Sequence, residues 1–444
     1  MNTLKPEISP DGPYFVSYRQ SDGTDTAVPV AWLLRAAGLP VWHDQTDLPP
    51  GNTETRLDEA LTGGLAGAVL VVTPEMQFSG VVRHRELPKL LELDRDPRFG
   101  FGIANTVRST SGRVDYAAPD RILDQVPGTL SNKKQHSVDT AGERRQLIRD
   151  LVIAHIHQKR AAIRDADSTI RIMTQTRTPP QAWEEDTADL KVRIRPGQTG
   201  RLPNLEGLED LALALPIVAD GVSASGAKTV HISGGMHLSV ALAVGAALPS
   251  TIVRKILVED VDGNVWVSGP ATQAHSDPEL LVRHNHLVNT ISPDGSSKVL
   301  VYMDLMPTPS DAALKTVLRD RAGEFVSFEH FKSRSGQMMS HTDAPSLAAE
   351  MLHKIKKISG ENSNAEIHLL FRGPYALAVL LGRLLNTLRV VAYEWDDTPT
   401  KPDSGPAPRY EPVLTLCPSV PEGPISRIHP RQEPDAVMAT ATKN

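Results

Sequence analysis

Cysteine is almost absent from this 444-residue chain, in which Cys417 is the single thiol. One thiol excludes an internal disulfide framework and a cluster in which several thiolates hold a metal, and it suits a reducing cytosol. Aromatic residues are also scarce, at 5%. The shares of hydrophobic residues, 40%, and of charged residues, 23%, are nevertheless ordinary for a folded globular chain. We expect a cytoplasmic protein without a metal site.

The sequence also lacks a segment long enough to cross a membrane. One of its two longest apolar runs, "MHLSVALAVGAALP" at 236–249, is shorter than the roughly 20 residues that a span requires, and Arg383 interrupts the other, at 375–391. The N-terminal stretch has no apolar core of a secretory signal. A net charge of -6 provides no field that would draw the chain onto DNA or RNA, which leaves room only for a local basic pocket.

The length suggests two or three domains, and a first domain can be delimited. Up to about residue 105, short apolar runs such as "YFVSY" and "AGAVLVVT" alternate with helical patterns such as "TAVPVAWLLRAAG". This alternation predicts a parallel sheet covered by helices. Residues 106–138 predict an irregular loop with one short helical piece. Residues 139–164, with apolar positions at helical spacing, predict a long helix that closes a domain of residues 1–165.

An internal repeat organises the second domain, residues 166–444. The stretch "VHISGGMHLSVALAVGAAL" at 230–248 aligns with "IHLLFRGPYALAVLLGRLL" at 367–385 at a constant offset of 137 residues. Each copy has an apolar strand, a turn with glycine and a helix of small apolar residues, and a further strand follows. Two such α/β units predict a pseudo-dimeric domain. The Pro-rich stretch from about residue 398 is expected to lie over the surface or to be partly mobile.

Four successive segments of the first domain resemble a TIR domain: "PYFVSYRQSDG", "GLPVWHDQTDLPPG", "AGAVLVVTPEM" and "VVRHRELPKL". The specific likeness is to NAD-cleaving TIR domains, in which the first strand ends in Ser-Tyr-Arg and a loop that ends in Gly follows an aromatic second strand. A glutamate on the helix after the third strand corresponds to Glu86, although Val82 and Arg83 stand where an aromatic residue commonly precedes it. The resemblance implies that Glu86 is catalytic. It also implies that NAD is bound by Tyr18, Arg19, Trp42, Asp47, Leu48 and Gly51.

A single glutamate suffices for this chemistry. An ordinary glycosidase needs two carboxylates, because its leaving oxygen must be protonated. Nicotinamide leaves its N-glycosidic bond as a neutral base, so one anion that stabilises the positively charged ribose is enough. Without the resemblance, Glu86 in "RHRELPK" would be assigned to a solvated helix face. Two interpretations stay open for Arg19, contact with the pyrophosphate or ordering of the loop, and two for Trp42, stacking on a ring or core packing.

Glycine appears in both repeat copies where a strand turns into a helix, in "ISGGMH" and "FRGPYA". Such turns let backbone N–H groups meet a phosphate at the positive end of a helix, although glycine also serves there as a simple cap. Residues 166–444 resemble a SAVED domain, a fusion of two CARF-like units that senses cyclic oligonucleotides. Trp395 would stack on adenine or pack in the core. The ligand residues implied by the resemblance are Gly234, Gly235, Met236, His237, Arg372, Gly373, Pro374, Tyr375 and Trp395.

Together the two resemblances imply an effector of bacterial CBASS antiphage signalling. The expected fold class is α/β, with a flavodoxin-like parallel-sheet TIR domain followed by a pseudo-duplicated, Rossmann-like SAVED domain. A cyclic oligoadenylate, first of all cyclic tri-AMP, would bind the second domain, and subunits would join head to tail into an oligomer or filament. NAD+ would then be hydrolysed as the substrate, with no cofactor. Two other functions stay open: a TIR scaffold without catalysis, and an enzyme like nucleoside deoxyribosyltransferases that exchanges bases without an activator.

Overall fold

The computed structural model describes most of the chain, and its internal contacts divide it into two compact units. The first unit comprises Met1–Pro196, Glu206–Gly235 and Ala247–Gly263, and the second comprises Gly197–Leu205, Met236–Ala246 and Asn264–Asn444. The described residues are 8–42, 63–177, 187–197, 200–269, 279–288, 297–308, 310–399 and 405–430.

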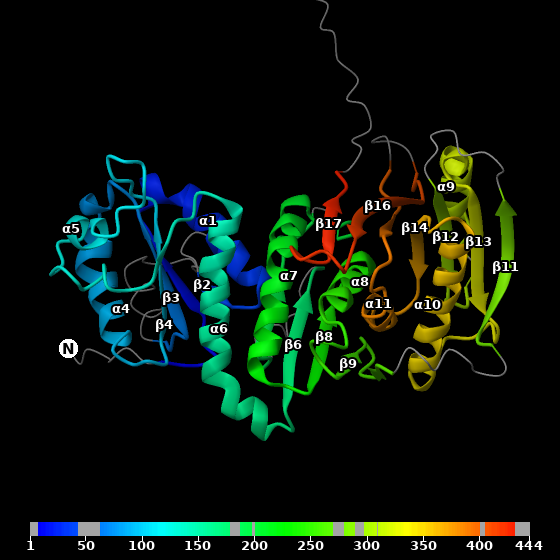
Figure 1. The fold of residues 1–444 in the computed structure, drawn as a ribbon, viewed down its shortest axis with the longest axis horizontal. Coiled ribbons are helices and arrows are strands. Elements are labelled where there is room, and N and C mark those ends of the chain that lie inside the picture. The colour runs from blue at the N-terminus through cyan, green and yellow to red at the C-terminus, as the bar shows by residue number, and fades with distance from the viewer. Residues whose placement is uncertain are drawn as a thin grey trace, which may run out of the picture. The chain divides into compact units, whose positions relative to one another are not determined.

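The first part of the chain folds around a parallel sheet. Its elements are β1 (Tyr14–Ser17), α1 (Gln20–Ala36), β2 (Val41–Trp42), β3 (Gly67–Val72), η1 (Met76–Phe78), η2 (Val82–Glu86), α4 (Leu87–Leu93), β4 (Gly100–Asn105), α5 (Ala118–Ile122), β5 (Gln135–His136) and α6 (Ala141–Asp165). The strand order is β2-β1-β3-β4-β5, and all pairs are parallel. Helices α1 and α6 contact each other and the sheet, and α4 covers the other face (Figure 1). The predicted parallel sheet covered by helices is confirmed.

Side chains alternate between the two faces of β1. Phe15 packs with Leu90 and Leu93 of α4, whereas the hydroxyl of Tyr14 donates a hydrogen bond to the carbonyl oxygen of Leu151 in α6 at 3.4 Å. Because successive strand residues point to opposite faces, Ser17 shares the α4 face with Phe15. The end of β1 therefore presents Ser17 toward the segment that leads into α4.

The helix predicted for 139–164 begins at Ala141, because Thr140 caps it. The Thr140 hydroxyl oxygen accepts a hydrogen bond from the Glu143 amide, and the Glu143 carboxylate accepts one from the Thr140 amide, which forms a capping box. The stretch 106–138 contains α5, in the place of the expected helical piece, and also β5, which the sequence pattern did not indicate.

Beyond α6 the chain forms two further sheets. Their elements are β6 (Thr169–Gln175), β7 (Leu190–Arg193), α7 (Leu205–Ser225), β8 (Thr229–Gly235), α8 (Leu238–Ala247), β9 (Lys255–Glu259), β10 (Val265–Val267), β11 (Leu281–Val288), β12 (Lys298–Asp304), α9 (Ala312–Arg321), η4 (Ala322–Glu324), β13 (Ser327–Ser333), η5 (His341–Asp343), α10 (Ala344–Glu361), β14 (Glu366–Arg372), α11 (Tyr375–Gly382), β15 (Val390–Asp396), β16 (Arg409–Leu416) and β17 (Ile425–Ile428). The two sheets have the orders β10-β9-β8-β6-β7 and β11-β13-β12-β14-β15-β16-β17.

The internal repeat is visible in the strand orders of these two sheets. Each contains four parallel strands with the same connectivity, β7-β6-β8-β9 in one and β13-β12-β14-β15 in the other. Strand β14 begins and ends 137 residues after β8, and α11 begins 137 residues after α8. The predicted pseudo-duplicated, Rossmann-like architecture is thus confirmed. The Pro-rich stretch after residue 398 was predicted to lie over the surface or to be partly mobile, but it contributes β16 and β17 to the third sheet.

Helices α8 and α11 approach each other through one glycine from each repeat copy. A Cβ atom added to Gly245 would lie 2.0 Å from the carbonyl oxygen of Val379, and one added to Gly382 would lie 2.1 Å from that of Leu242. Gly382 and Val379 are the repeat counterparts of Gly245 and Leu242, so the crossing is reciprocal. Only glycine allows the two backbones to come this close.

The first compact unit also includes a junction between α6, the chain before β1 and the start of β7, which is built around the buried Lys159. The ammonium group of Lys159 lies 2.7 Å from the carboxylate of Asp11 and 3.6 Å from that of Asp189. Beside these contacts, the amide of Lys191 donates to the carbonyl oxygen of Gly38, at the end of α1, at 2.7 Å. The first sheet and the start of the second are therefore held together within one unit.

Candidate functional site

The strand order of the first sheet defines a topological switch point between β1 and β3. The chain passes from β1 to β2 on one side and resumes with β3 on the other side of β1. In open parallel sheets, ligands bind outside the carboxyl ends of the strands at such a point. Ser17, Tyr18 and Arg19 lie at the end of β1, and Thr73 and Glu75 follow β3.

Glu86 lies at this switch point and is buried. The turn η2 is π-helical, since the amide of Leu87 donates to the carbonyl oxygen of Val82, and α4 continues directly from it. Glu86 is only 7% exposed, and its Oε2 accepts a hydrogen bond from the Oγ of Ser17 at 2.5 Å. Single π turns in helices concentrate at functional sites. The structure therefore places Glu86 against β1 and not on a solvated helix face.

Arg19 joins the two chain segments that leave the switch point. Its guanidinium group lies 3.1 Å from the carboxylate of Asp22 in the first turn of α1 and 2.8 Å from that of Glu75 after β3. The hydrogen bond to Asp22, followed by the one to Glu75, raises the pKa of Arg19. Arg19 is thus held by two neighbouring carboxylates. The loop after β2, which Arg19 was expected to order, lies outside the described residues, so both interpretations of Arg19 stay predictions.

The other residues predicted to bind NAD have different surroundings. Tyr18 is 6% exposed, and the ring of Trp42 is half-buried and packs on Phe15, with 5.4 Å between ring centroids and 33° between the planes. This contact favours the core interpretation of Trp42. Asp47, Leu48 and Gly51, predicted for the loop after β2, lie outside the described residues.

Sequence reasoning gave no role in the site to two hydroxyl groups at the switch point. One is Ser17, whose bond to Glu86 depends on the alternation along β1 and on the π turn. The other is Thr73, which is 2% exposed and whose Oγ1 has no hydrogen-bond partner within the described residues. Alternation along β1 would have placed Ser17 on the correct face, but no local signal marks Thr73.

In the first repeat copy, the glycine turn is shaped by neighbouring backbone. Gly234 has φ of +104°, and a Cβ atom there would lie 2.3 Å from the carbonyl oxygen of Thr174, so the position requires glycine. The amide of Gly235 donates to the side-chain oxygen of Gln175 at 3.0 Å. The Gln175 side chain thus accepts the hydrogen bond of the Gly235 amide, which was expected to bind a phosphate.

The N-terminus of α8 also has an anion of its own. Met236 and His237 precede the helix and are buried, at 3% and 0% exposure. The amide of Ser239 donates to Oε1 of Glu394 at 2.6 Å, and Glu394 is 2% exposed. A buried carboxylate at a helix N-terminus is stabilised by the same partial positive charge that would attract a phosphate.

In the second repeat copy, Arg372 lies at the carboxyl end of β14, next to the end of β12. Its guanidinium group donates to the Asp304 carboxylate at 2.8 Å and to the carbonyl and hydroxyl oxygens of Thr308. Burial opposes ionisation of Asp304, but the neighbouring His330 imidazole, 3.8 Å away, and the hydrogen bond from Arg372 outweigh it and lower the pKa of the Asp304 carboxyl. Strands β12 and β14 flank the switch point of this sheet, so Arg372 lies where a ligand is expected.

The remaining predicted residues of the second copy follow Arg372 or lie on β15. Gly373 leads into Pro374, which caps α11, and Tyr375 is the first residue of that helix, at 9% exposure. Trp395 is partly buried against the core, and the guanidinium group of Arg201 lies 5.1 Å from its ring centroid. The ring therefore combines core packing with a cation–π contact.

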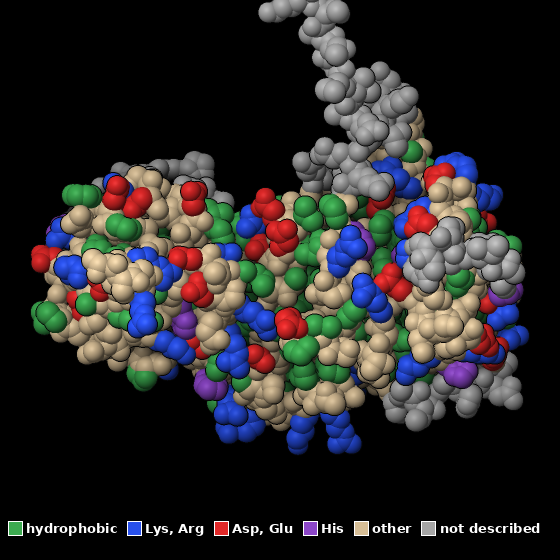
Figure 2. Space-filling view, turned by 45° about the horizontal axis from the view of Figure 1, so that its top comes forward, with side chains coloured by type: hydrophobic (Ala, Val, Ile, Leu, Met, Phe, Trp, Pro, Cys, Tyr) green, Lys and Arg blue, Asp and Glu red, His purple; other side chains and the backbone are tan. Residues whose placement is uncertain are grey.

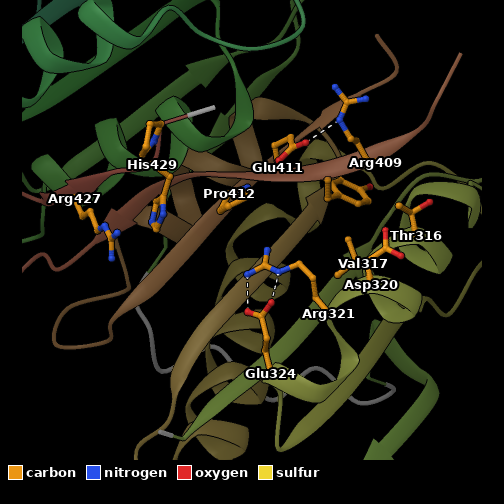
Figure 3. Close-up of a pocket in the computed structure, with 12 residues that line it drawn as sticks. Thr316, Val317, Asp320, Arg321, Glu324, Arg409, Glu411, Pro412, Arg427 and His429 are labelled. Atoms are coloured by element: carbon orange, nitrogen blue, oxygen red, sulfur yellow. Dashed lines mark hydrogen bonds and ion pairs between the residues drawn. The ribbon is translucent and has the colours of Figure 1, made fainter. Parts of the chain in front are cut away.

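A cavity of about 700 Å³ lies in the second compact unit (Figure 3). Arg321 is paired there with Glu324, and Arg409 with Glu411. Burial, and next the charge of Arg427, lower the pKa of His429 in this cavity to about 4. The lining residues are Thr316, Val317, Asp320, Arg321, Glu324, Arg409, Tyr410, Glu411, Pro412, Arg427, His429 and Pro430. None of them belongs to the sequence-predicted site.

The charges of the described surface are mixed. On the face seen in Figure 2, acidic and basic side chains are interspersed. Among the described residues, no group of three or more His, Cys, Asp and Glu side chains is arranged to hold a metal ion. No helix in the described ranges is both long enough and apolar enough to span a membrane.

The geometry defines a class of protein: a flavodoxin-like domain with a buried carboxylate at its switch point, followed by a duplicated Rossmann-like domain. Comparison with family models agrees with both parts. Residues 15–98 match the TIR domain model, and residues 215–416 match SAVED, the "SMODS-associated and fused to various effectors sensor domain". The chain therefore joins an N-terminal TIR domain to a C-terminal SAVED domain. No curated protein matches it.

Solved structures with similarity to the chain include SAVED/CARF-domain containing receptors named Cap4. The Acinetobacter baumannii receptor with the cyclic trinucleotide 2'3'3'-cAAA is 13% identical, with 79% of this chain and 80% of that chain covered and a TM-score of 0.43. The same receptor with 3'3'3'-cAAA is 14% identical, with 90% and 100% covered and a TM-score of 0.43. The Moraxella osloensis receptor is 13% identical, with 87% and 96% covered and a TM-score of 0.40. Likenesses at this level assign neither a ligand nor an activity to this chain.

Proposed function

We propose that this chain is an NAD+ nucleosidase with Glu86 as its catalytic residue, and that a cyclic oligoadenylate bound by the SAVED domain activates it. The observation that carries the proposal is the burial of Glu86 at the switch point of the TIR sheet, in hydrogen-bond contact with the end of β1. A glutamate of a solvated helix face would have neither the burial nor the partner. The match to a sensor family behind the TIR domain supports regulation by a ligand.

The reaction requires one bond to break and one to form. The bond between C1' of the ribose and the nicotinamide nitrogen breaks, and the electron pair leaves with neutral nicotinamide. The oxygen of a water molecule then bonds to C1', one proton is released, and ADP-ribose is the product; attack by a group of the ADP moiety would give a cyclic form. Positive charge develops on the ribose on the way, and a fixed anion such as the Glu86 carboxylate stabilises it.

Activation would proceed through assembly. The two repeat copies of the SAVED domain are alike in topology but unequal in sequence, which suits head-to-tail contact between subunits and open filaments. Neighbouring TIR domains would then complete each other's sites, with the segment that contains Asp47 and Leu48 as the contributed part. Depletion of NAD+ in an infected cell would be the outcome of the signal in antiphage defence.

The test measures nicotinamide release from NAD+ by the purified full-length chain, with and without cyclic di-, tri- and tetra-adenylates. We expect turnover only with an activator, and its loss in Glu86→Gln. Glu92→Gln is the matched control, because Glu92 is an exposed residue of α4 and its neutralisation leaves the site unchanged. Light scattering on the same samples is expected to report a sharp increase in size with the activator.

The outcomes separate the proposal from the two other functions. Absence of turnover with every cyclic nucleotide would favour a non-catalytic TIR scaffold. Base exchange without an activator would favour an enzyme like nucleoside deoxyribosyltransferases. Turnover that is equal in Glu86→Gln and in the unmodified chain would exclude Glu86, and activated turnover by a monomer would exclude assembly as the switch.

A further inference from the structure

The contact between Ser17 and Glu86 joins two buried groups from segments that are distant in the sequence. Ser17 is 0% exposed and Glu86 is 7% exposed, and the donor and acceptor oxygens are 2.5 Å apart. Oxygen–oxygen distances of about 2.5–2.7 Å are typical of hydroxyl groups that donate to an ionised carboxylate. Such bonds are among the stronger hydrogen bonds of proteins.

The surrounding fold fixes both partners of this bond. Ser17 is the last residue of β1, which lies between β2 and β3 in the sheet, and its side chain points to the face that Phe15 shares with α4. Glu86 is the last residue of the π turn, and Leu87, which follows it, is 0% exposed in the core. Both partners of the bond thus belong to segments that the core of the domain holds in place.

We propose that Ser17 is a positioning residue for Glu86, and that its hydroxyl group fixes the carboxylate at the carboxyl end of β1 in the orientation that serves the ribose. This inference rests on the proposed NAD+ nucleosidase function. One hydroxyl donor uses one of about four acceptor positions of a carboxylate. It also favours the ionised form of the carboxylate, because the bond is stronger to the charged group.

A nucleophilic role for Ser17 fits the contact less well. A serine nucleophile needs a base that takes its proton and a third group that orients the base. The oxocarbenium-like ribose already reacts readily with water, so a covalent intermediate offers no advantage here. Ser17 is therefore assigned to act through Glu86 and not on the substrate.

The chain contains a matched control for this contact. In the same domain, the Oγ of Ser131 donates to Oδ2 of Asp120, also at 2.5 Å. Asp120 accepts further bonds from the amides of Gly128, Leu130 and Ser131, and thus organises the loop after α5. Ser131→Ala removes a hydroxyl–carboxylate bond of the same length that plays no part in the proposed site.

The experiment compares Ser17→Ala, Ser17→Thr and Ser131→Ala as full-length proteins, with the activator that gives turnover in the unmodified chain. In Ser17→Ala we expect kcat to fall about ten- to a hundredfold, KM to change less than about threefold, and the acidic limb of the kcat profile to move to higher pH. Ser17→Thr keeps the hydroxyl group and is expected to restore most of kcat. Ser131→Ala is expected to leave the pH profile in place.

A double-mutant cycle with Ser17→Ala and Glu86→Gln, followed by thermal unfolding, measures the coupling energy between the two side chains. This measurement does not require turnover. Coupling in this cycle together with the kinetic result supports the proposal. Normal kcat and an unmoved pH profile in Ser17→Ala, in an active protein, overturn the positioning role and leave the nucleosidase function intact. A covalent ADP-ribosyl adduct on Ser17 in mass spectra would replace it with a nucleophilic role. Absence of turnover in the unmodified chain overturns the proposed function, and the role of Ser17 with it, even if the cycle shows coupling.

Discussion

A single added methyl group is expected to force helices α8 and α11 apart at the point where they cross. In Gly245→Ala the new Cβ would lie 2.0 Å from the carbonyl oxygen of Val379, and in Gly382→Ala 2.1 Å from that of Leu242, whereas ordinary contact begins at 3.4 Å. Each change thus requires the two helices to separate by about 1.3–1.4 Å, the difference between these distances. The atom that the new Cβ meets belongs to the backbone, so rotation of a side chain cannot relieve the overlap.

The expected cost follows from two opposing effects. Overpacking of this kind costs about 3 kcal/mol, and replacing glycine by alanine within a helix returns up to about 1 kcal/mol. The free energy of unfolding is therefore expected to fall by about 2 kcal/mol. For a domain of the size of the SAVED domain, this loss lowers the melting temperature by roughly 4–8 °C. The double variant is expected to lose less than the sum, because helices already separated by one methyl group accommodate the second.

Scanning calorimetry of the full-length chain measures these effects. Gly360→Ala in α10 is the matched control, because a Cβ atom there meets nothing within 4 Å, and it is expected to leave the melting temperature unchanged or slightly higher. Hydrogen exchange of the peptide that covers α11 localises the change. Gly245→Ala with the stability of Gly360→Ala, or strictly additive losses in the double variant, would refute the reciprocal crossing.

Two further predictions concern the first compact unit. Thr73→Val is expected to leave the melting temperature unchanged or higher, because it removes a buried hydroxyl group without a partner in the described residues; if that hydroxyl group binds the substrate, KM for NAD+ rises about tenfold. Burial, and next the charge of Lys159, lower the pKa of His155 to about 4. Between about pH 6.5 and 4, His155 binds more protons in the unfolded chain than in the native chain. Its contribution to the free energy of unfolding, up to about 3 kcal/mol and fully present above pH 6.5, is therefore lost as the pH falls through this window.

Each of these predictions has its own control. Thr73→Ser keeps the hydroxyl group and should retain the KM of the unmodified chain; an unchanged KM in Thr73→Val would show that the hydroxyl group does not contact NAD+. His155→Gln keeps an amide that can donate to the carbonyl oxygen of Asp189, the partner of the imidazole at 3.1 Å. Thermal unfolding between pH 7 and 4 should show a smaller loss of stability in this variant, and an equal loss would assign the pH dependence to other groups.

Local patterns predicted those parts of the fold in which neighbouring residues decide the structure. The run "GAVLVV" predicted β3 because a parallel strand covered on both faces is apolar throughout. The offset of 137 residues predicted the repeat because equivalent glycine turns and helices occupy equivalent places. The place of Glu86 came from the resemblance, since a lone glutamate in a charged helical segment carries no signal of burial.

Contacts between distant residues could not be predicted in this way. Ser239 and Glu394 are 155 positions apart, and nothing near "ISGGMH" indicates that a carboxylate meets the amide of Ser239. Gln175 and Gly235 are likewise 60 positions apart. The glycine turns alone suggested unoccupied anion sites, because a turn pattern reports backbone freedom and not the side chains that the sheet brings to it.

The π turn at Val82–Glu86 limits which changes of chain length this segment can accept. A π turn is equivalent to one extra residue accommodated within a helix. Deleting Arg83 or His84 would let the segment relax to an ordinary α-helix, in which each residue turns by about 100°. With α4 anchored in the core through Leu87 and Leu90, the chain between β3 and the deletion would absorb that rotation. Glu75, which lies in this segment, would then lose its contact with Arg19. Single-residue gaps here should therefore be rarer in working relatives than substitutions.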